Sequence, residues 1–139
     1  MRTKKTLESI LIWFKISKIH NENITLSNRI LKEYGLTLAQ FDVIAQLGVD
    51  REHTQSELTE KLLVTKANIS QLLATMEEKG LVLRRQEWKT KFVSLTEEGI
   101  KIHDQVVPLM EHFQTKTFSP LTDEERTVFL DFLRKIEKG

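Results

Sequence analysis

The sequence TKANISQLLATMEEKGLVLRRQEWKTK, residues 65–91, contains two patterns in succession. Apolar side chains recur at helical spacing across Lys66–Glu78, and Gly80 follows at the place where a left-handed residue ends many helices. The pattern then changes, because β-type residues fill 81–86 and 91–95 on either side of a short polar link at 87–90. This stretch therefore predicts a helix followed directly by a β-hairpin.

Two shorter helices are predicted just before this segment. In a capping box, a Ser or Thr side chain and a Glu or Gln side chain three residues later each accept a hydrogen bond from the other's backbone N–H. Such boxes begin at Thr37 and Thr54, so we expect helices over Leu38–Leu47 and over 55–63. A tight turn at Leu63-Val64 would then lead into the longer helix. Two short helices, a turn, a longer helix and a hairpin together predict a winged helix-turn-helix.

Longer helices are expected on both sides of this region. Residues 4–31 place apolar and small polar side chains on one stripe with a seven-residue repeat. Thr96 can cap a helix that contains Pro108, where we expect a kink, and another capping box at Thr122 opens the last helix. We therefore predict a mainly α fold with a small β-hairpin wing, as a single domain. It would comprise 1–139, with a winged helix-turn-helix DNA-binding lobe at 34–97 and helical regions at 1–33 and 98–139.

The composition limits the possible functions. The 139 residues include 40% hydrophobic and 29% charged side chains, which is typical of one globular domain. There is no cysteine, which excludes thiol catalysis, cysteine-ligated zinc and disulfides. The sequence contains no Gly-x-Ser-x-Gly, His-Glu-x-x-His or P-loop motif, so we predict no enzyme activity. The longest apolar run, 10–14, is too short for a signal segment or a membrane span, which favours a cytoplasmic protein.

A local cluster of positive charge indicates a polyanionic partner. The net charge is only +1, but residues 79–91 hold five basic side chains against the single acid Glu87. On the preceding helix, the face opposite Ile69 and Met76 presents side chains that are small or carry amides, a surface that fits the DNA major groove. The candidate DNA-binding residues are Ser56, Thr65, Lys66, Ala67, Asn68, Ser70, Gln71, Thr75, Arg84, Arg85, Lys89 and Lys91. The alternative is an ordinary amphipathic helix in a winged-helix protein-interaction module without DNA binding.

Three short motifs follow one another in this region. They are Gly35-Leu36-Thr37 with Gln40-Phe41, Glu78-Lys79-Gly80-Leu81-Val82 with Arg84, and Val93-Ser94-Leu95-Thr96 with Gly99. In this order they resemble the MarR family of bacterial transcription regulators. The resemblance implies a homodimer joined through its N- and C-terminal helices, which binds a pseudo-palindromic operator in double-stranded DNA, more often as a repressor than as an activator. It also implies that a small phenolic or lipophilic effector weakens DNA binding.

The chain departs from the family pattern at positions that would contact DNA. Gln71 and Thr75 stand where the family often carries arginine. In the wing, which looks shorter than usual, Lys89 takes the usual arginine position and Glu87 the usual aspartate position. Because a lysine cannot make the forked planar contacts of a guanidinium, we expect this wing to contribute affinity more than specificity. Trp88 at the wing tip is expected to pack back on its own lobe, with insertion towards DNA sugars or bases as the alternative.

Polar residues on the stripe of the first helix suggest an effector site. The family's effectors bind in the general region between the dimer helices and the DNA-binding lobe. There Ser17 and Asn21 would line a pocket of mixed polarity, together with their neighbours His20 and Trp13. Alternatively, the polar positions Ser17, Asn21 and Asn28 set the helix register at a dimer seam.

Neither a metal nor another cofactor is predicted. His103 and His112 are nine residues apart, so they face opposite sides of a regular helix. Zinc sites need clustered histidine and acidic ligands, which the sequence does not assemble. A metal-responsive regulator is therefore a less favoured alternative.

Overall fold

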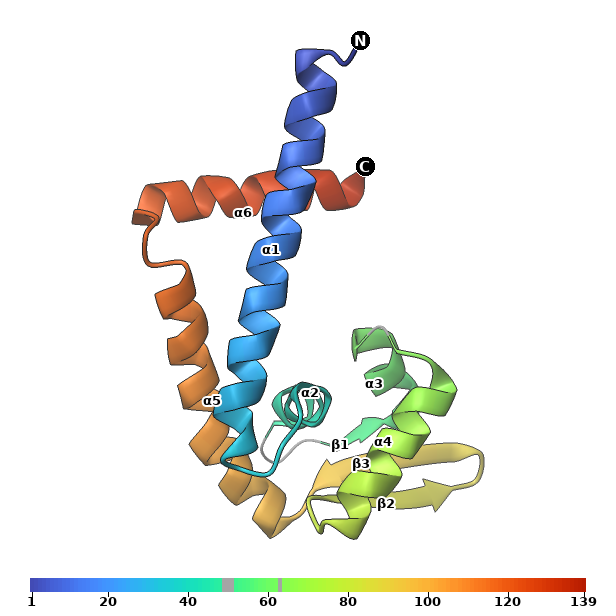
Figure 1. The fold of residues 1–139 in the computed structure, drawn as a ribbon. Coiled ribbons are helices and arrows are strands. Elements are labelled where there is room, and N and C mark those ends of the chain that lie inside the picture. Colours follow the sequence, from blue (N-terminus) through green and yellow to red (C-terminus); the bar gives the residue numbers. More distant parts are fainter. Residues whose placement is uncertain (49–51, 63) are drawn as a thin grey trace. The chain divides into compact units, whose positions relative to one another are not determined.

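The computed structural model describes residues 1–48, 52–62 and 64–139, so the predicted turn residue Leu63 lies outside them. This part of the chain forms six α-helices and one three-stranded sheet (Figure 1), which confirms the predicted mainly α fold class. Residues 1–107 and 108–139 are two compact units. The elements are α1 (Lys4–Lys32), α2 (Leu38–Leu47), β1 (Glu52–Thr54), α3 (Gln55–Leu62), α4 (Lys66–Glu78), β2 (Val82–Glu87), β3 (Thr90–Leu95), α5 (Glu97–Thr117) and α6 (Asp123–Lys138).

Local hydrogen bonds explain where the helices begin. At α2, the Thr37 hydroxyl accepts from the Gln40 backbone N–H, and the Gln40 side chain accepts from the Thr37 N–H. The same box forms at α3 between Thr54 and Glu57, and at α6 from Thr122. Hydrogen bonds from Thr54 hold the pKa of the Glu57 carboxyl below its usual range. The three predicted capping boxes are thus confirmed.

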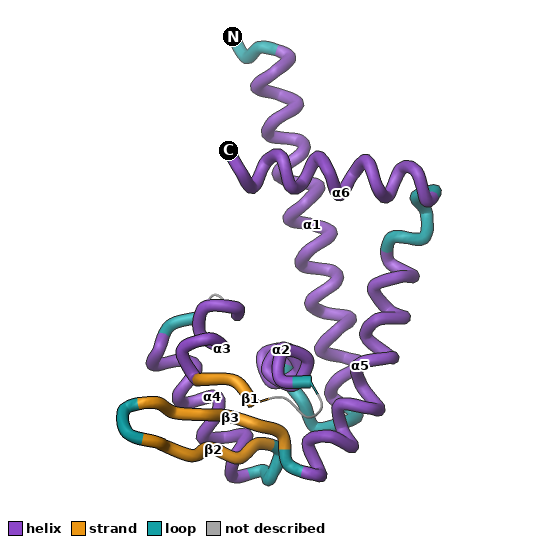
Figure 2. Tube along the Cα trace, turned by 180° about the vertical axis from the view of Figure 1, so that it is seen from behind, coloured by secondary structure: helices purple, strands orange, loops and turns teal. Residues whose placement is uncertain are grey.

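The sheet contains a strand that the sequence pattern does not reveal. Figure 2 shows β1 beside the β2–β3 hairpin, and the strand order is β1-β3-β2 with antiparallel pairing throughout. β1 is only three residues long and pairs Glu52 with Ser94 and Thr54 with Phe92. A segment this short has no detectable alternation of its own, because its strand conformation depends on the pairing with β3.

The hairpin turn is shorter than predicted. Glu87 and Thr90 were expected in the polar link, but they are paired across the two strands. The turn therefore consists of Trp88 and Lys89 alone. Two-residue turns require a positive φ at their first position in order to match the twist of the strands, and Trp88 adopts φ +57°.

The core of the winged helix-turn-helix lies between α2, α3, α4 and the sheet. On α4, Ile69, Leu73 and Met76 are completely buried, as the apolar spacing predicts. They share this core with other completely buried side chains, among them Val43, Ile44, Leu47, Leu58 and Val93. This packing fixes which face of α4 points outward, because the buried face is opposite.

Helices α1 and α6 carry apolar side chains that the chain leaves exposed. Leu7, Ile10 and Phe14 on the predicted stripe of α1 are all exposed, whereas Leu31 at its end is buried. No residue of α6 is buried. Pro108 lies inside α5, and the boundary between the two compact units falls immediately before it. No helix in the described ranges combines the length and the apolar character that a membrane span requires.

Candidate nucleic-acid interface

The outward face of α4 is uncharged over most of its length. Ala67, Asn68 and Gln71 are exposed, and Ser70 and Thr75 are half-buried beside them. The Thr75 hydroxyl donates a hydrogen bond to the Gln71 carbonyl oxygen at 3.2 Å. Among the described residues the Gln71 side-chain amide has no hydrogen-bond partner, so its donor and acceptor are both free for an external group.

A cavity of about 500 Å³ opens beside this face, between α3, α4 and the wing turn. It contains three lysines and no carboxylate among the described residues that line it. We call it the lysine pocket, lined by Thr54, Gln55, Ser56, Thr59, Lys66, Ile69, Ser70, Lys89, Thr90 and Lys91. It therefore unites predicted DNA-binding residues from α3, α4 and the wing: Ser56, Lys66, Ser70, Lys89 and Lys91.

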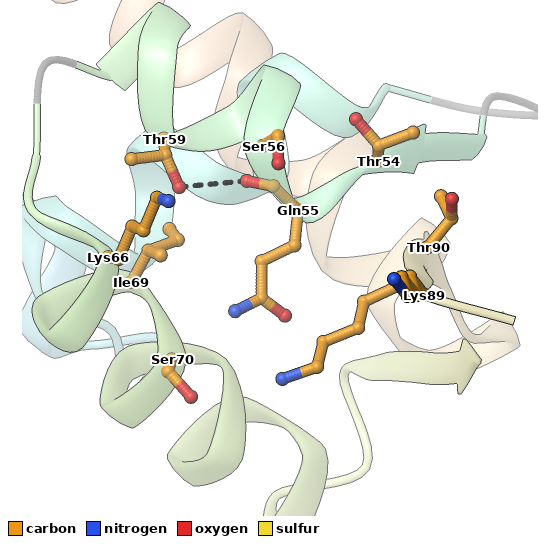
Figure 3. A pocket seen from close by; sticks show the side chains of 10 residues that line it. Thr54, Gln55, Ser56, Thr59, Lys66, Ile69, Ser70, Lys89 and Thr90 are labelled. Atoms are coloured by element: carbon orange, nitrogen blue, oxygen red, sulfur yellow. Dashed lines mark hydrogen bonds between the residues drawn. The ribbon is translucent and has the colours of Figure 1, made fainter.

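The polar groups of the lysine pocket converge on its interior. Figure 3 shows the side chains of Gln55 and Lys89 pointing towards one another across the cavity, with Ser70 below them. The Gln55 carbonyl accepts from the Thr59 hydroxyl at 2.8 Å, whereas the Gln55 side-chain oxygen is buried and has no partner among the described residues. Ammonium, amide and hydroxyl donors around an open cavity form a site suited to an anionic oxygen.

The two wing arginines differ from the wing lysines in their partners. Arg84 forms an ion pair with Glu77 at the end of α4, at 3.1 Å. Arg85 binds Glu52 through two hydrogen bonds of 2.8 and 3.2 Å and also contacts Glu87 at 2.9 Å. Hydrogen bonding to Glu52 and Glu87 raises the pKa of the Arg85 guanidinium further above its usual value.

The free positive charge of the wing is therefore that of its lysines. Among the described residues, no carboxylate lies within ion-pair distance of Lys89 or Lys91. The sequence places Arg84, Arg85, Lys89 and Lys91 in one basic group, whereas the structure divides them into two paired arginines and two free lysines. Glu87 and Glu77 are near these arginines in sequence, whereas Glu52 lies 33 residues before Arg85, and no local signal could have identified that pairing.

The expectation that Trp88 packs back on its own lobe is wrong. The residue is 93% exposed. A two-residue turn leaves no length of chain for the side chain to fold back, and the turn projects past α4 in Figure 2. The indole is thus presented to solvent at the end of the hairpin.

The four candidate effector residues all lie on one helix, α1. Trp13, His20 and Asn21 are exposed and Ser17 is half-buried. Asn21 lines a shallow depression of about 340 Å³ that also includes Leu26. The third polar position of the stripe, Asn28, instead accepts a hydrogen bond from the Leu38 N–H at 3.2 Å and so anchors the start of α2.

The histidines provide no metal site in the described ranges, where no three His, Cys, Asp or Glu side chains are suitably grouped. His103 contacts Asp104 at 3.1 Å. His53 is buried in β1, and its Nδ1 has no hydrogen-bond partner among the described residues.

The architecture and the site together define a class of protein. A helix-turn-helix with an uncharged outward face on its second helix, followed by a basic hairpin, is the arrangement of winged helix-turn-helix DNA-binding proteins. The model of the MarR family matches residues 34–87. An uncharacterised HTH-type transcriptional regulator of Bacillus cereus is 39% identical over 129 residues, covering 92% of this chain and 88% of the relative. The chain therefore belongs to the MarR family of transcriptional regulators, which are not enzymes.

Solved structures agree with this assignment. AbsC, a MarR family regulator from Streptomyces coelicolor, superposes with a TM-score of 0.88 at 20% identity, covering 99% of this chain and 95% of that one. A variant of MarR from E. coli, crystallised with operator DNA, gives a TM-score of 0.82 at 25% identity, covering 93% of this chain and 95% of that one. These structures share the fold of the chain, and the 39% identical Bacillus cereus relative confirms the predicted family.

Proposed function

We propose that the protein is a homodimeric, sequence-specific repressor that binds a pseudo-palindromic operator. The lysine pocket beside the uncharged face of α4 is the observation that carries this proposal. Free lysines supply attraction to phosphates, and the neutral face next to them supplies groups that distinguish base edges. The similarity to E. coli MarR, whose variant was crystallised with operator DNA, supports DNA as the partner.

In this proposal α4 enters the major groove with its N-terminal end towards the backbone. Thr65 caps α4 by accepting from the Asn68 N–H at 3.1 Å, so the remaining free N–H groups and Lys66 face a phosphate. Ser56 at the start of α3 and Lys89 on the wing lie around the same cavity and bind the adjoining backbone. Arg84 and Arg85 support the wing through their ion pairs. Those of their N–H groups that the ion pairs do not use face the DNA.

Gln71 is the residue proposed to read a base. Its free amide lies at the middle of the outward face of α4, where it could pair with an adenine edge in a bidentate contact worth about 1–3 kcal/mol of discrimination. Gln71→Ala is therefore expected to relax the preference at one base pair in each half-site and to leave the melting temperature nearly unchanged. Selection from randomised duplexes with both proteins measures this. Identical base preferences would show that Gln71 reads no base and would shift the assignment to Ala67, Asn68 or Ser70.

The exposed apolar faces of α1 and α6 support the homodimer. Exposing the aromatic and aliphatic side chains of α1 and α6 to water is unfavourable in free energy. A second copy of the chain would cover them. We expect sedimentation to give a dimer at micromolar concentration and Phe132→Glu to weaken it strongly, because a charge would be buried. Leu83→Glu, a control at an exposed apolar position of the wing, should remain dimeric. A folded wild-type monomer at that concentration would contradict the dimer.

The proposal includes release of DNA by a small phenolic or lipophilic effector bound near Trp13, Ser17, His20 and Asn21. Trp13, Ser17 and His20 follow one another at four- and three-residue spacing, and Asn21 lies four residues after Ser17, so the four positions share one side of α1. An exposed indole beside hydroxyl, imidazole and amide groups suits an aromatic ligand with a polar substituent. A partner subunit would provide a second wall of this site.

A further inference from the structure

The wing tip carries a large aromatic side chain that is almost fully exposed in the free protein. We propose that Trp88 is a DNA-contacting residue whose indole enters the minor groove and packs against sugars and base edges when the lysine pocket holds the backbone. This inference rests on the proposed DNA-binding function and adds to it an apolar contact. Trp88 stands directly before Lys89, which lines the lysine pocket.

The backbone conformation that the turn requires of Trp88 is unfavourable for a bulky side chain. Trp88 is the one non-glycine residue with positive φ among those the structure describes. Bulky side chains rarely adopt this conformation, and such strain is typical of residues that contact ligands. An asparagine or glycine would relieve the strain, and either would also avoid exposing an indole to water.

The hairpin holds the indole in a defined place. The Gln86 side-chain amide donates to the Trp88 carbonyl oxygen at 3.0 Å, which ties the turn to β2. At the preceding position of β2, Arg85 pairs with both Glu52 of β1 and Glu87, and its guanidinium lies 4.3 Å from the centre of the Phe92 ring. These contacts stiffen the hairpin up to its turn, so the cost of ordering the tip on binding is small.

The charges around Trp88 favour DNA as its partner. Lys89, which follows it in the turn, points into the lysine pocket (Figure 3), and Lys91 lines the same pocket. A phosphate held there brings the neighbouring sugars and groove edge to the tip of the same hairpin. Apolar side chains that enter the minor groove do so next to cations that hold the backbone, and an indole is thin enough for that groove.

Two variants separate the indole from the shape of the turn. Trp88→Asn keeps a residue that tolerates positive φ and removes the ring, whereas Trp88→Phe keeps an aromatic ring of smaller area. The probe is a duplex selected by the wild-type protein from a randomised library. We expect Trp88→Asn to lose roughly tenfold in affinity, and Trp88→Phe to lose less. The melting temperature of Trp88→Asn should equal or exceed that of the wild type. Leu83→Ala, which removes an exposed apolar side chain elsewhere on the wing, should bind as the wild type does.

Tryptophan fluorescence gives a second readout. The chain has two tryptophans, so a DNA-induced change present in the wild type and absent in Trp88→Phe belongs to Trp88. Wild-type affinity in Trp88→Asn, or an equal fluorescence change in Trp88→Phe, would overturn the inference while leaving the proposed function intact. If the wild type binds no duplex even at low salt, the proposed function itself fails.

Discussion

Replacing Lys66, Lys89 and Lys91 together by Gln is expected to lower DNA affinity by roughly a thousandfold at physiological salt. The three ammonium groups line one cavity and have no carboxylate partner among the described residues, so in the free protein their charge is not already neutralised. Each lysine–phosphate contact steepens the slope of log K against log salt by about 0.9. Replacing three lysines in each subunit of the proposed dimer should therefore flatten that slope by about five units. Titration of a fluorescent duplex at several salt concentrations measures both quantities.

A matched variant tests whether position or net charge is responsible. Lys101, Lys135 and Lys138 are exposed and lie outside the lysine pocket, so their joint replacement by Gln makes the same change in net charge. We expect this control to lose little affinity, because none of its three lysines lines the lysine pocket. Equal losses in the two triple variants would mean that only the overall charge matters. An unchanged slope in the pocket variant would place the lysine pocket away from the DNA.

The sequence predicts the helices well because their ends depend on local chemistry. The boxes at Thr37, Thr54 and Thr122 each involve residues three apart, and all three form. The buried face of α4 is equally readable, since the spacing of Ile69 and Met76 already places them on one side. The outward face of α4 lies opposite this buried face, so the sequence of the helix alone is enough to predict it.

The sequence predicts the sheet and its charges less well because both depend on distant partners. β1 becomes a strand through pairing with β3, which lies about forty residues further on. The same pairing brings Glu52 to Arg85, so the basic cluster at 79–91 contains less free charge than its composition suggests. Trp88 illustrates a third limit: its exposure follows from the exact length of the turn, and an error of one residue at each end changes the expected packing.

Replacing Gly99 by Ala is expected to destabilise the protein strongly. A Cβ atom at Gly99 would collide with the backbone carbonyl oxygen of Leu81, which cannot rotate away as a side chain could. That oxygen also accepts the Thr96 N–H at 3.1 Å, and the Thr96 hydroxyl accepts the Gly99 N–H at 3.0 Å, so the start of α5 and the start of β2 are held together at this point. We expect a loss of about 3 kcal/mol, from overpacking and the weakened junction, and a fall in Tm of roughly 10 °C.

Gly80→Ala provides the contrast, because a Cβ at Gly80 would meet nothing within 4 Å although its φ is +76°. Its cost is conformational alone, about 1 kcal/mol for a left-handed alanine, so its Tm should fall by only a few degrees. Thermal unfolding followed by circular dichroism ranks the two variants against the wild type. A Tm of Gly99→Ala equal to that of the wild type, or higher than that of Gly80→Ala, would contradict this prediction. The junction between Leu81 and α5 would then be loose enough to admit a methyl group. The close approach would then have no role in positioning the wing, since β2 begins at the residue after Leu81.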